Sequence, residues 1–230
     1  MEILVQVDHL SKSYGTKVAL KDVCLTIPTG KIIGLLGKNG SGKSTLIKLI
    51  NGLLRKDAGM IKVSGYEPGV ETKRLISYLP ERTYLDRSQS VQQILTFFQD
   101  FYPDFNLEKA KRLIQDLGLD LNMKISSMSK GMQEKLQLIL VMSRNAKLYI
   151  LDEPLGGVDP STRDYILDTI LTNFSEDASI LISTHLIFDV ERILDDVIFV
   201  DQGVIRGYEE ADRLRTEQGC SIDTYFRRTF

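Results

Sequence analysis

The stretch Gly34–Thr45, GLLGKNGSGKST, decides the fold class of this 230-residue chain. It fits the pattern G-x-x-x-x-G-K-[ST], in which glycines permit backbone angles that a side chain would forbid. Successive backbone N–H groups can then converge on phosphate oxygens. The apolar KIIGLLG predicts a strand before the loop, and STLIKLINGLL predicts a helix after it, with its positive end toward the same phosphate. This context favours a phosphate-binding loop over a tight glycine turn that is followed by Lys-Ser by chance.

The expected ligand of the loop is ATP with Mg²⁺. Lys43 would reach the β- and γ-phosphates as a point charge, and Ser44 would offer its hydroxyl to the metal. The whole expected loop comprises Gly37, Lys38, Asn39, Gly40, Ser41, Gly42, Lys43, Ser44 and Thr45.

Two acids, Asp152 and Glu153, close the segment LYILDEP, whose apolar part predicts a core strand. Open α/β sheets place their ligands at the carboxyl ends of strands. We therefore expect Asp152 to help hold Mg²⁺ through water, and Glu153 to activate the attacking water as a general base. A solvated turn is the alternative for two acids at a strand end, and the phosphate loop favours the catalytic interpretation.

Apolar strands alternate with amphipathic helices along most of the chain, which predicts an α/β, P-loop NTPase core with a mostly parallel sheet. ILVQVDHL and VCLTI alternate apolar and polar residues, and we expect them in an N-terminal antiparallel β-subdomain. From approximately 82–145 the pattern turns helical, which predicts an inserted helical subdomain in a single domain over 1–230. The C-terminal extension, 207–230, is charged and weakly patterned, and the sequence assigns it no role.

The spacing of apolar residues also predicts the lengths of individual helices. STLIKLINGLL would continue its apolar stripe through Leu53, and TRDYILDTILTNF would continue its stripe through Phe174. LIFDVERIL predicts one further helix. Asn106 is a suitable N-cap, and Gly118 a suitable stop, for the helix in NLEKAKRLIQDLGL.

Composition excludes several classes of protein. Hydrophobic residues make up 43% and charged residues 26%, with a net charge of -2 and no basic run, so nucleic acid is not an expected partner. The two cysteines, Cys24 and Cys220, form neither a disulfide framework nor a metal-ligand pattern, which fits a reducing cytosol. The N-terminus does not resemble a signal peptide, and no apolar run approaches the roughly 18 residues that span a bilayer. A membrane role would require another, membrane-spanning chain.

Three further motifs follow the phosphate loop in order. MSKGMQ lies at an expected helix start shortly ahead of LYILDEP, GGVDP follows the two acids, and STH ends at His185. Each is weak alone, but in this order, after a phosphate loop, they are specific. Nearly the whole chain resembles the ATP-binding cassette (ABC) family.

The resemblance implies how the site is completed. SKG before a helix offers a hydroxyl and free N–H groups, and MSKGMQ matches the segment known as the signature of the family. In this family two subunits pack head-to-tail, so that the signature of each subunit covers the γ-phosphate bound by the other. The signature residues are Ser129, Lys130, Gly131 and Met132. Asp159 would link the two sites, His185 would contact the γ-phosphate, and Tyr14 would stack on adenine. Each assignment has a plainer alternative. The signature could be only a helix cap, and Asp159 only part of an Asp-Pro turn. His185 could be a polar residue with satisfied hydrogen bonds, and Tyr14 an ordinary strand residue.

Two departures from the family pattern concern the expected metal site and the signature. The metal site would use Ser44, Glu81 and Asp152, but Glu81 stands where the family usually has glutamine, which adds a charge and loses the amide donors. Lys130 replaces a glycine and Met132 a glutamine. The SKGM form, together with YLPE, resembles the ATPase subunits of bacterial exporters of drugs, peptides or polysaccharides.

The sequence therefore predicts a cytoplasmic ATPase subunit, peripheral at the inner face of the cell membrane, which uses ATP and Mg²⁺. It would pair with itself or with a related subunit and work with a multi-span membrane permease. A soluble ABC ATPase without a channel is the alternative, and a small-molecule P-loop kinase is a third, in which the signature and His185 would have no function. The sequence specifies neither the transported substrate nor the direction of transport.

Overall fold

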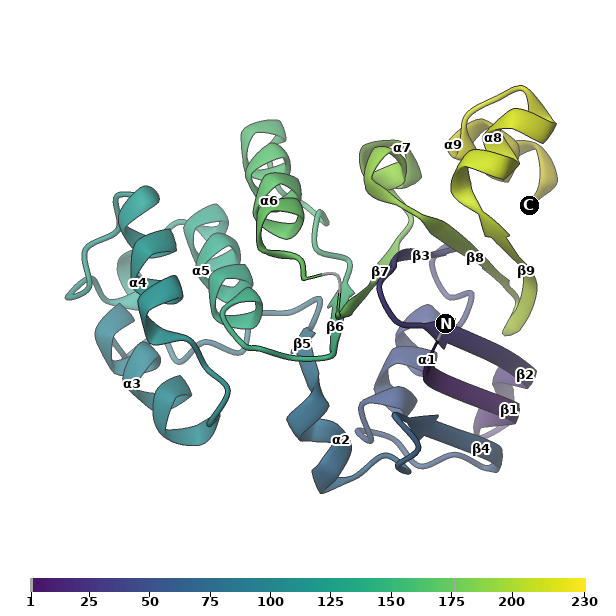
Figure 1. Cartoon of the computed structure of the whole chain (residues 1–230), viewed down its shortest axis with the longest axis horizontal. Coiled ribbons are helices and arrows are strands. Elements are labelled where there is room, and N and C mark those ends of the chain that lie inside the picture. Colours follow the sequence, from purple (N-terminus) through teal and green to yellow (C-terminus); the bar gives the residue numbers. More distant parts are fainter. Residues whose placement is uncertain (1, 176) are drawn as a thin grey trace.

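The computed structural model describes residues 2–175 and 177–230; Met1 and Glu176, which belong to the expected domain, lie outside the described residues. The described chain forms a six-stranded sheet and a three-stranded sheet, with helices packed around them (Figure 1). The predicted α/β class, with a mostly parallel sheet and an N-terminal antiparallel sheet, is confirmed.

The six-stranded sheet has the order β5-β6-β7-β3-β8-β9, and only β9 runs antiparallel to its neighbour. Its strands are β3 (Ile32–Leu36), β5 (Ile76–Leu79), β6 (Leu148–Asp152), β7 (Ser179–Thr184), β8 (Asp196–Asp201) and β9 (Val204–Glu210). Because β5, β6, β7 and β3 are parallel neighbours, their carboxyl ends lie side by side at one edge of the sheet. Adjacent strand ends are then only about 4.8 Å apart.

Both faces of this sheet are buried, as the continuous apolar strands require. Leu36 and Ile182 pack on one face with α6 (Pro160–Asn173) and the C-terminal helices, whereas their strand neighbours Leu35 and Leu181 pack on the other. That second face is covered by α1 (Lys43–Ile50) and by the three-stranded sheet. Neighbouring residues alternate between the two clusters because successive side chains of a strand point to opposite faces.

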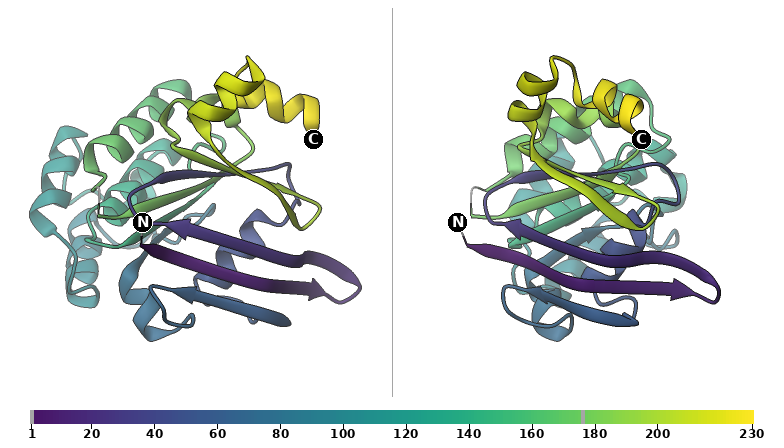
Figure 2. Two further views of the ribbon diagram at one scale, coloured as in Figure 1. Left: turned by 45° about the vertical axis from the view of Figure 1, so that its right-hand side comes forward. Right: turned by 90° about the vertical axis from the view of Figure 1, so that its right-hand side faces the viewer.

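The three-stranded sheet is antiparallel and has the order β2-β1-β4. It consists of β1 (Ile3–Tyr14), β2 (Lys17–Pro28) and β4 (Ala58–Val63), and it lies beneath the larger sheet in Figure 2. Gly15, with a φ of 59°, makes the tight turn between β1 and β2. This turn brings Tyr14 at the end of β1 toward the edge that carries the phosphate loop.

A separate layer of helices lies at one end of the molecule (Figure 1). It contains α3 (Val91–Phe101), α4 (Leu107–Asp116), the short 3₁₀ helix η1 (Ile125–Ser127) and α5 (Lys130–Met142), and it has its own apolar core. The side chain of Ser90 caps α3, and that of Asn106 caps α4 as the sequence predicted. These helices lie within the expected insertion, 82–145, whose boundaries stay a prediction.

Arg144 joins the helical layer to the edge strand of the large sheet. Its buried guanidinium contacts the Asp104 carboxylate at 3.1 Å and donates to the carbonyls of Ile76 at 2.6 Å and Arg74 at 3.0 Å. It also lies 4.1 Å from the centre of the Tyr102 ring. The planar, five-donor guanidinium suits such a set of partners, and lysine would satisfy only part of it. Arg144 therefore helps to hold the helical layer next to β5, together with the hydrogen bond from Ser77 to the Val141 carbonyl of α5 at 2.8 Å.

The C-terminal extension is regular structure that the sequence pattern did not predict. After β9 come α8 (Ala211–Gln218) and α9 (Ile222–Thr229), which pack on the large sheet through a cluster of aromatic rings. Phe199 of β8 lies 5.6 Å from Tyr225, 6.1 Å from Phe226 and 5.4 Å from Phe230 between ring centres. Aromatic packing against β8, a non-local interaction, holds these polar helices in place.

Three predicted helices end earlier than expected. Helix α1 stops at Ile50 because Gly52 adopts a left-handed φ of 68°, and Leu53 is 55% exposed rather than on the buried stripe. Helix α6 ends at Asn173, one residue before Phe174. LIFDVERIL is divided into α7 (Ile187–Val190) and a 3₁₀ turn, η2 (Glu191–Ile193). Within the described ranges, no helix has the length and apolar character needed to cross a bilayer.

Candidate functional site

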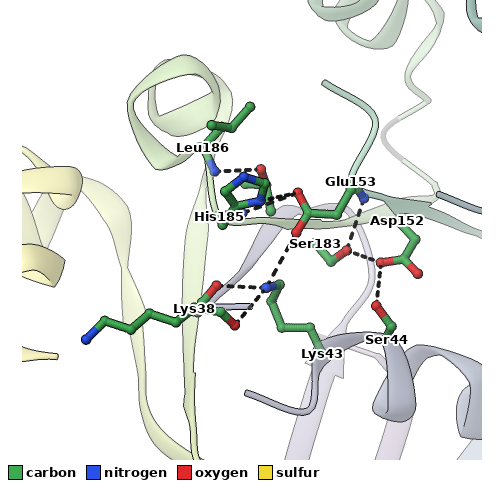
Figure 3. Close-up of polar contacts among 10 residues, drawn as sticks. Lys38, Lys43, Ser44, Asp152, Glu153, Ser183, His185 and Leu186 are labelled. Atoms are coloured by element: carbon green, nitrogen blue, oxygen red, sulfur yellow. Dashed lines mark hydrogen bonds and ion pairs between the residues drawn. The ribbon is translucent and has the colours of Figure 1, made fainter. Parts of the chain in front are cut away.

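Four neighbouring strands deliver the candidate residues to one edge of the large sheet. Glu81 follows β5, Asp152 ends β6 with Glu153 directly after it, His185 follows β7, and the glycine loop follows β3. Residues from all four segments line one open cleft of about 940 Å³. Figure 3 shows Glu153 between Lys43 and His185, and Asp152 directed toward Ser44 and Ser183.

The glycine loop is shaped by steric limits at its glycines. Gly40 and Gly42 have φ values of 80° and 114°, which L side chains rarely adopt. A side chain on Gly42 would also meet the Ala19 carbonyl oxygen at 2.7 Å, and one on Gly37 would meet the Val200 carbonyl oxygen at 2.3 Å. The loop can therefore hold this curled backbone only with glycine at these positions.

The ammonium group of Lys43 lies at the centre of the loop and is 5% exposed. It donates to the carbonyl of Gly37 at 2.7 Å and to that of Lys38 at 3.3 Å, and it lies 3.5 Å from the Glu153 carboxylate. The hydroxyl of Ser41 is buried nearby without a hydrogen-bond partner among the described residues. A buried cation, an unpaired hydroxyl and a helix N-terminus form a donor set that fits phosphate oxygens.

Asp152 is 2% exposed and is held by two hydroxyls. Ser183 donates to its carboxylate at 2.5 Å and Ser44 at 3.2 Å. Burial raises the pKa of the Asp152 carboxyl, and the hydrogen bonds from Ser183 and Ser44 oppose that shift. Burial thus disfavours the charged form in the absence of a cation.

The oxygens of Ser44 and Asp152 are suited to Mg²⁺. In residues 2–175 and 177–230, no three His, Cys, Asp or Glu side chains form a metal-binding cluster. Mg²⁺ in nucleotide sites uses one or two protein oxygens and completes its shell with phosphate and water. The Ser44 hydroxyl and the Asp152 carboxylate supply oxygens of that kind, and Glu81 lies on the same cleft.

Glu153 adopts a left-handed backbone conformation, with a φ of 52°, which is uncommon for a residue that is not glycine. Its N–H donates to the Ser183 carbonyl at 3.0 Å, and the same N–H reaches the Ser183 hydroxyl at 3.2 Å. Its carboxylate lies 2.9 Å from Nδ1 of His185. The surrounding hydrogen bonds hold this strained backbone so that the carboxylate lies between Lys43 and His185 (Figure 3).

Tyr14 also lines the cleft. Its ring is 48% exposed, and Lys12 lies 5.8 Å from the ring centre. An exposed ring at the rim of a phosphate site offers a face on which a nucleotide base can stack. The adenine role of Tyr14 stays a prediction.

The signature and Asp159 do not face the centre of this cleft. Ser129 caps α5, where its hydroxyl accepts a hydrogen bond from the Met132 N–H at 3.3 Å. Ser129, Gly131, Met132 and Asp159 line a second hollow of about 450 Å³, and Lys130 lines both cavities. Asp159 is the N-cap of α6, and hydrogen bonds from Ser161 and Thr162 lower the pKa of its carboxyl.

Most of the predicted site residues therefore line one cleft, and the rest form its loop or the second hollow. Those on the cleft are Tyr14, Asn39, Gly40, Gly42, Lys43, Ser44, Thr45, Glu81, Lys130, Asp152, Glu153 and His185. Gly37, Lys38 and Ser41 form the loop without lining the cleft. The Lys38 side chain reaches instead to the Phe230 carbonyl oxygen.

Sequence reasoning missed Ser183 and a group of polar residues on α5. Ser183 joins Asp152 to Glu153, and it is the serine of the STH motif, in which only His185 was assigned a role. Gln133, Glu134 and Gln137 also line the cleft. Their polar character in an otherwise apolar helix was visible in the sequence, but the side of the helix that faces the cleft was not.

Comparisons with known proteins agree with this geometry. A family model described as ABC transporter matches residues 20–156. The chain is 32% identical over 217 residues to ABC transporter ATP-binding protein YtrB of Bacillus subtilis, covering 93% of this chain and 74% of that protein. It is 31% identical over 212 residues to lantibiotic transport ATP-binding protein SrtF of Streptococcus pyogenes, covering 91% and 92%.

A third relative and two solved structures extend the comparison. Nod factor export ATP-binding protein I of Sinorhizobium fredii is 32% identical over 233 residues, covering 96% of this chain and 67% of that protein. A solved ATP-binding subunit of an ABC transporter matches with a TM-score of 0.86 and 30% identity, covering 98% of both chains. A nucleotide-free ATP-binding cassette, at 22% identity and a TM-score of 0.78 over 94% of this chain and 95% of that one, shares the fold.

Asp152→Asn should stabilise the nucleotide-free protein at pH 7. Burial raises the pKa of the Asp152 carboxyl in the folded state, so the folded protein loses stability as pH rises through its titration range. Asparagine removes that loss and keeps an oxygen for the two serines. Urea unfolding should give a higher free energy of unfolding for the variant at pH 7, and the difference should shrink as pH falls below about 4.

The exposed Asp100 provides a matched control, because Asp100→Asn removes a charge that is not buried. A lower free energy of unfolding for Asp152→Asn than for the wild type at pH 7 would contradict the assignment of a carboxylate whose charged form is disfavoured by burial.

Proposed function

The chain belongs to the ABC transporter family as an ATP-binding subunit, and from this we propose that it hydrolyses ATP in the cleft to power a separate membrane permease. The observation that carries the proposal is the convergence of Lys43, Glu153 and His185. The Lys43 ammonium lies 3.5 Å from the Glu153 carboxylate, which lies 2.9 Å from the His185 ring. A cation that can bind phosphate therefore lies next to a carboxylate that can accept a proton from water.

The chemistry follows from these positions. The glycine loop and Lys43 hold the β- and γ-phosphates, and the oxygen of a water molecule attacks the γ-phosphorus. Glu153 accepts the proton of that water, while the bond from the γ-phosphorus to the bridging oxygen breaks and ADP leaves. His185 holds the Glu153 carboxylate in place and contacts the γ-phosphate. The Ser44 hydroxyl and the Asp152 carboxylate would hold Mg²⁺, which would supply positive charge next to the phosphates.

We propose that two subunits pair head-to-tail to complete each site. The signature residues Ser129 and Gly131 line a hollow outside the cleft of their own chain, together with Asp159. A serine hydroxyl and a helix N-terminus suit a phosphate that a second subunit brings. The pair can be formed with itself or with a related subunit, because a two-fold arrangement needs only matching surfaces.

An exposed aromatic patch on the helical layer supports docking of the permease. The patch consists of Tyr84, Phe97 and Phe101, which are 47%, 54% and 64% exposed. Phe97 and Phe101 stack with ring centres 5.7 Å apart, and Tyr84 lies 6.5 Å from the buried Phe98. Exposed aromatic rings in one patch are typical of a protein contact.

The loop after β5 connects this patch to the cleft. Glu81, Arg82 and Thr83 line the cleft, and Tyr84 follows them directly on the patch. A shift of Glu81 on nucleotide binding would therefore move Tyr84 at the docking surface. We propose that this short loop passes the state of the cleft to the permease.

The proposed direction of transport is export, from a position on the cytoplasmic face of the membrane. Relatives named for Nod factor export and lantibiotic transport support a role with transported organic molecules. A soluble ABC ATPase without a permease remains the alternative, and association with a multi-span protein separates the two.

Glu153→Gln should keep ATP binding and lose about 10²–10⁴-fold in turnover, because the amide cannot accept the proton of water. The variant should also form a stable dimer with ATP and Mg²⁺, which size-exclusion chromatography with light scattering measures. Wild-type turnover in this variant would remove Glu153 from the proposed role. Glu191→Gln, after α7, is a control outside the cleft.

The double variant Phe97→Ser with Phe101→Ser should lose copurification with a multi-span protein from detergent extracts. Both rings are exposed, so ATP binding and the thermal midpoint should stay close to those of the wild type. Leu171→Ser, at a 47% exposed residue of α6, is the matched control and should retain the partner. Equal recovery of the membrane protein with the double variant would contradict the docking surface. Wild-type protein that recovers no membrane protein would favour the soluble alternative.

A further inference from the structure

One side of α5 is polar along the wall of the cleft. Lys130, Gln133, Glu134 and Gln137 all line it, at a spacing that places them on one face of a helix. The opposite side of the helix, with Leu136, Ile139 and Leu140, belongs to the core of the helical layer. Lys130–Gln137 is therefore a polar boundary between that core and the nucleotide cleft.

Gln137 is the buried end of this polar face. It is 3% exposed, and its amide nitrogen has no hydrogen-bond partner among the described residues. An unpaired amide in the interior costs free energy that methionine or leucine at this position would avoid. Both sequence neighbours are leucine, so packing alone does not call for a polar residue here.

The acceptor that best suits this amide is the Glu81 carboxylate. Glu81 lines the same cleft from the loop after β5, and in residues 2–175 and 177–230 no group donates a hydrogen bond to its carboxylate or forms an ion pair with it. Burial is the main cause of the raised pKa values of Tyr78 and Asp152, and the negative charge of Glu81 adds a smaller contribution to both. Glu81 thus adds negative charge next to other acids without a donor to orient it.

Glu134 is the competing acceptor for the amide. Its Oε2 is buried without a partner, and it lies three residues before Gln137 on the same face of α5. Its other oxygen, however, lies 3.5 Å from the Lys130 ammonium, so its charge is already compensated. Glu81 is exposed in the open cleft and forms no ion pair within residues 2–175 and 177–230, so its carboxylate would need a new donor once closure of the cleft removes its water.

We propose that Gln137 is a positioning residue, whose amide donates a hydrogen bond to the Glu81 carboxylate when the cleft closes on ATP. Gln137 then supplies from α5 the amide that Glu81 itself lacks. This hydrogen bond would link the helical layer to the loop that leads to Tyr84. Closure of the cleft would then be coupled to movement of the docking surface. This inference rests on the proposed function, because it assigns a role to a residue in the same cleft.

The test replaces Gln137 with methionine in the full chain. Without nucleotide, the thermal midpoint should be equal to or higher than that of the wild type, because an unpaired buried amide is removed. With ATP and Mg²⁺, kcat should fall about tenfold while KM for ATP changes less than about twofold, as expected for one lost hydrogen bond to a charged group. In a Glu81→Ala background, Gln137→Met should have no further effect.

Gln133→Met is the matched control on the same helix face. Its amide already donates to the carbonyls of Met128 at 3.1 Å and Ile125 at 3.3 Å. This control should therefore lower the thermal midpoint without nucleotide, and its effect on turnover should not depend on Glu81.

A readout without turnover keeps the test separate from the proposed function. In the Glu153→Gln background, ATP should slow hydrogen exchange of the amides in 81–84, and Gln137→Met should abolish that slowing. A lower midpoint of Gln137→Met without nucleotide would overturn the inference, as would an effect that vanishes with Glu134→Ala rather than with Glu81→Ala. If the wild type hydrolyses no ATP, the proposed function fails, and the midpoint and exchange results still decide the role of Gln137.

Discussion

The site depends on one buried positive charge. The Lys43 ammonium is 5% exposed, and it is compensated by two carbonyls of its own loop and by the Glu153 carboxylate at 3.5 Å. A buried charge is tolerated only where partners are close, so the loop after β3 and the acid after β6 must meet. The order of the sheet allows this, because the ends of β6, β7 and β3 are neighbours. The position of Glu153, the proposed general base, thus follows from strand order and from one ion pair.

Local sequence signals predicted the parts of the site that local geometry controls. The glycine loop, the acids Asp152 and Glu153, and the N-cap Asn106 follow from residues that are close in sequence. Features that depend on distant contacts could not be predicted: Ser183 lies 31 residues from the Asp152 it holds, and α9 is held by rings on β8. The left-handed backbone of Glu153 belongs to this group, since the hydrogen bonds that its N–H donates to Ser183 of β7 maintain it. The predicted end of α1 was wrong, because Gly52 stops the helix before Leu53.

The cleft and its loop carry several features that work against stability. Burial disfavours the charged form of Asp152, Glu153 has a strained backbone, and Ser41 and Gln137 contain buried polar atoms without partners among the described residues. The core beneath them is apolar and closely covered on both faces, which allows the edge of the sheet to hold such groups. Groups of this kind are suited to ligands, because each gains a partner when charge or hydrogen-bonding atoms enter the cleft.

Equilibrium binding of ATP to Lys43→Ala, measured by calorimetry with Mg²⁺, tests the central role of this charge most directly. Lys48→Ala, at an exposed residue of the same helix, is the matched control. The account predicts that Lys43→Ala weakens ATP binding by about a hundredfold, because a buried charge partner of the phosphates is lost, while Lys48→Ala binds as the wild type does. Wild-type affinity in Lys43→Ala would contradict the assignment of the cleft as the ATP site.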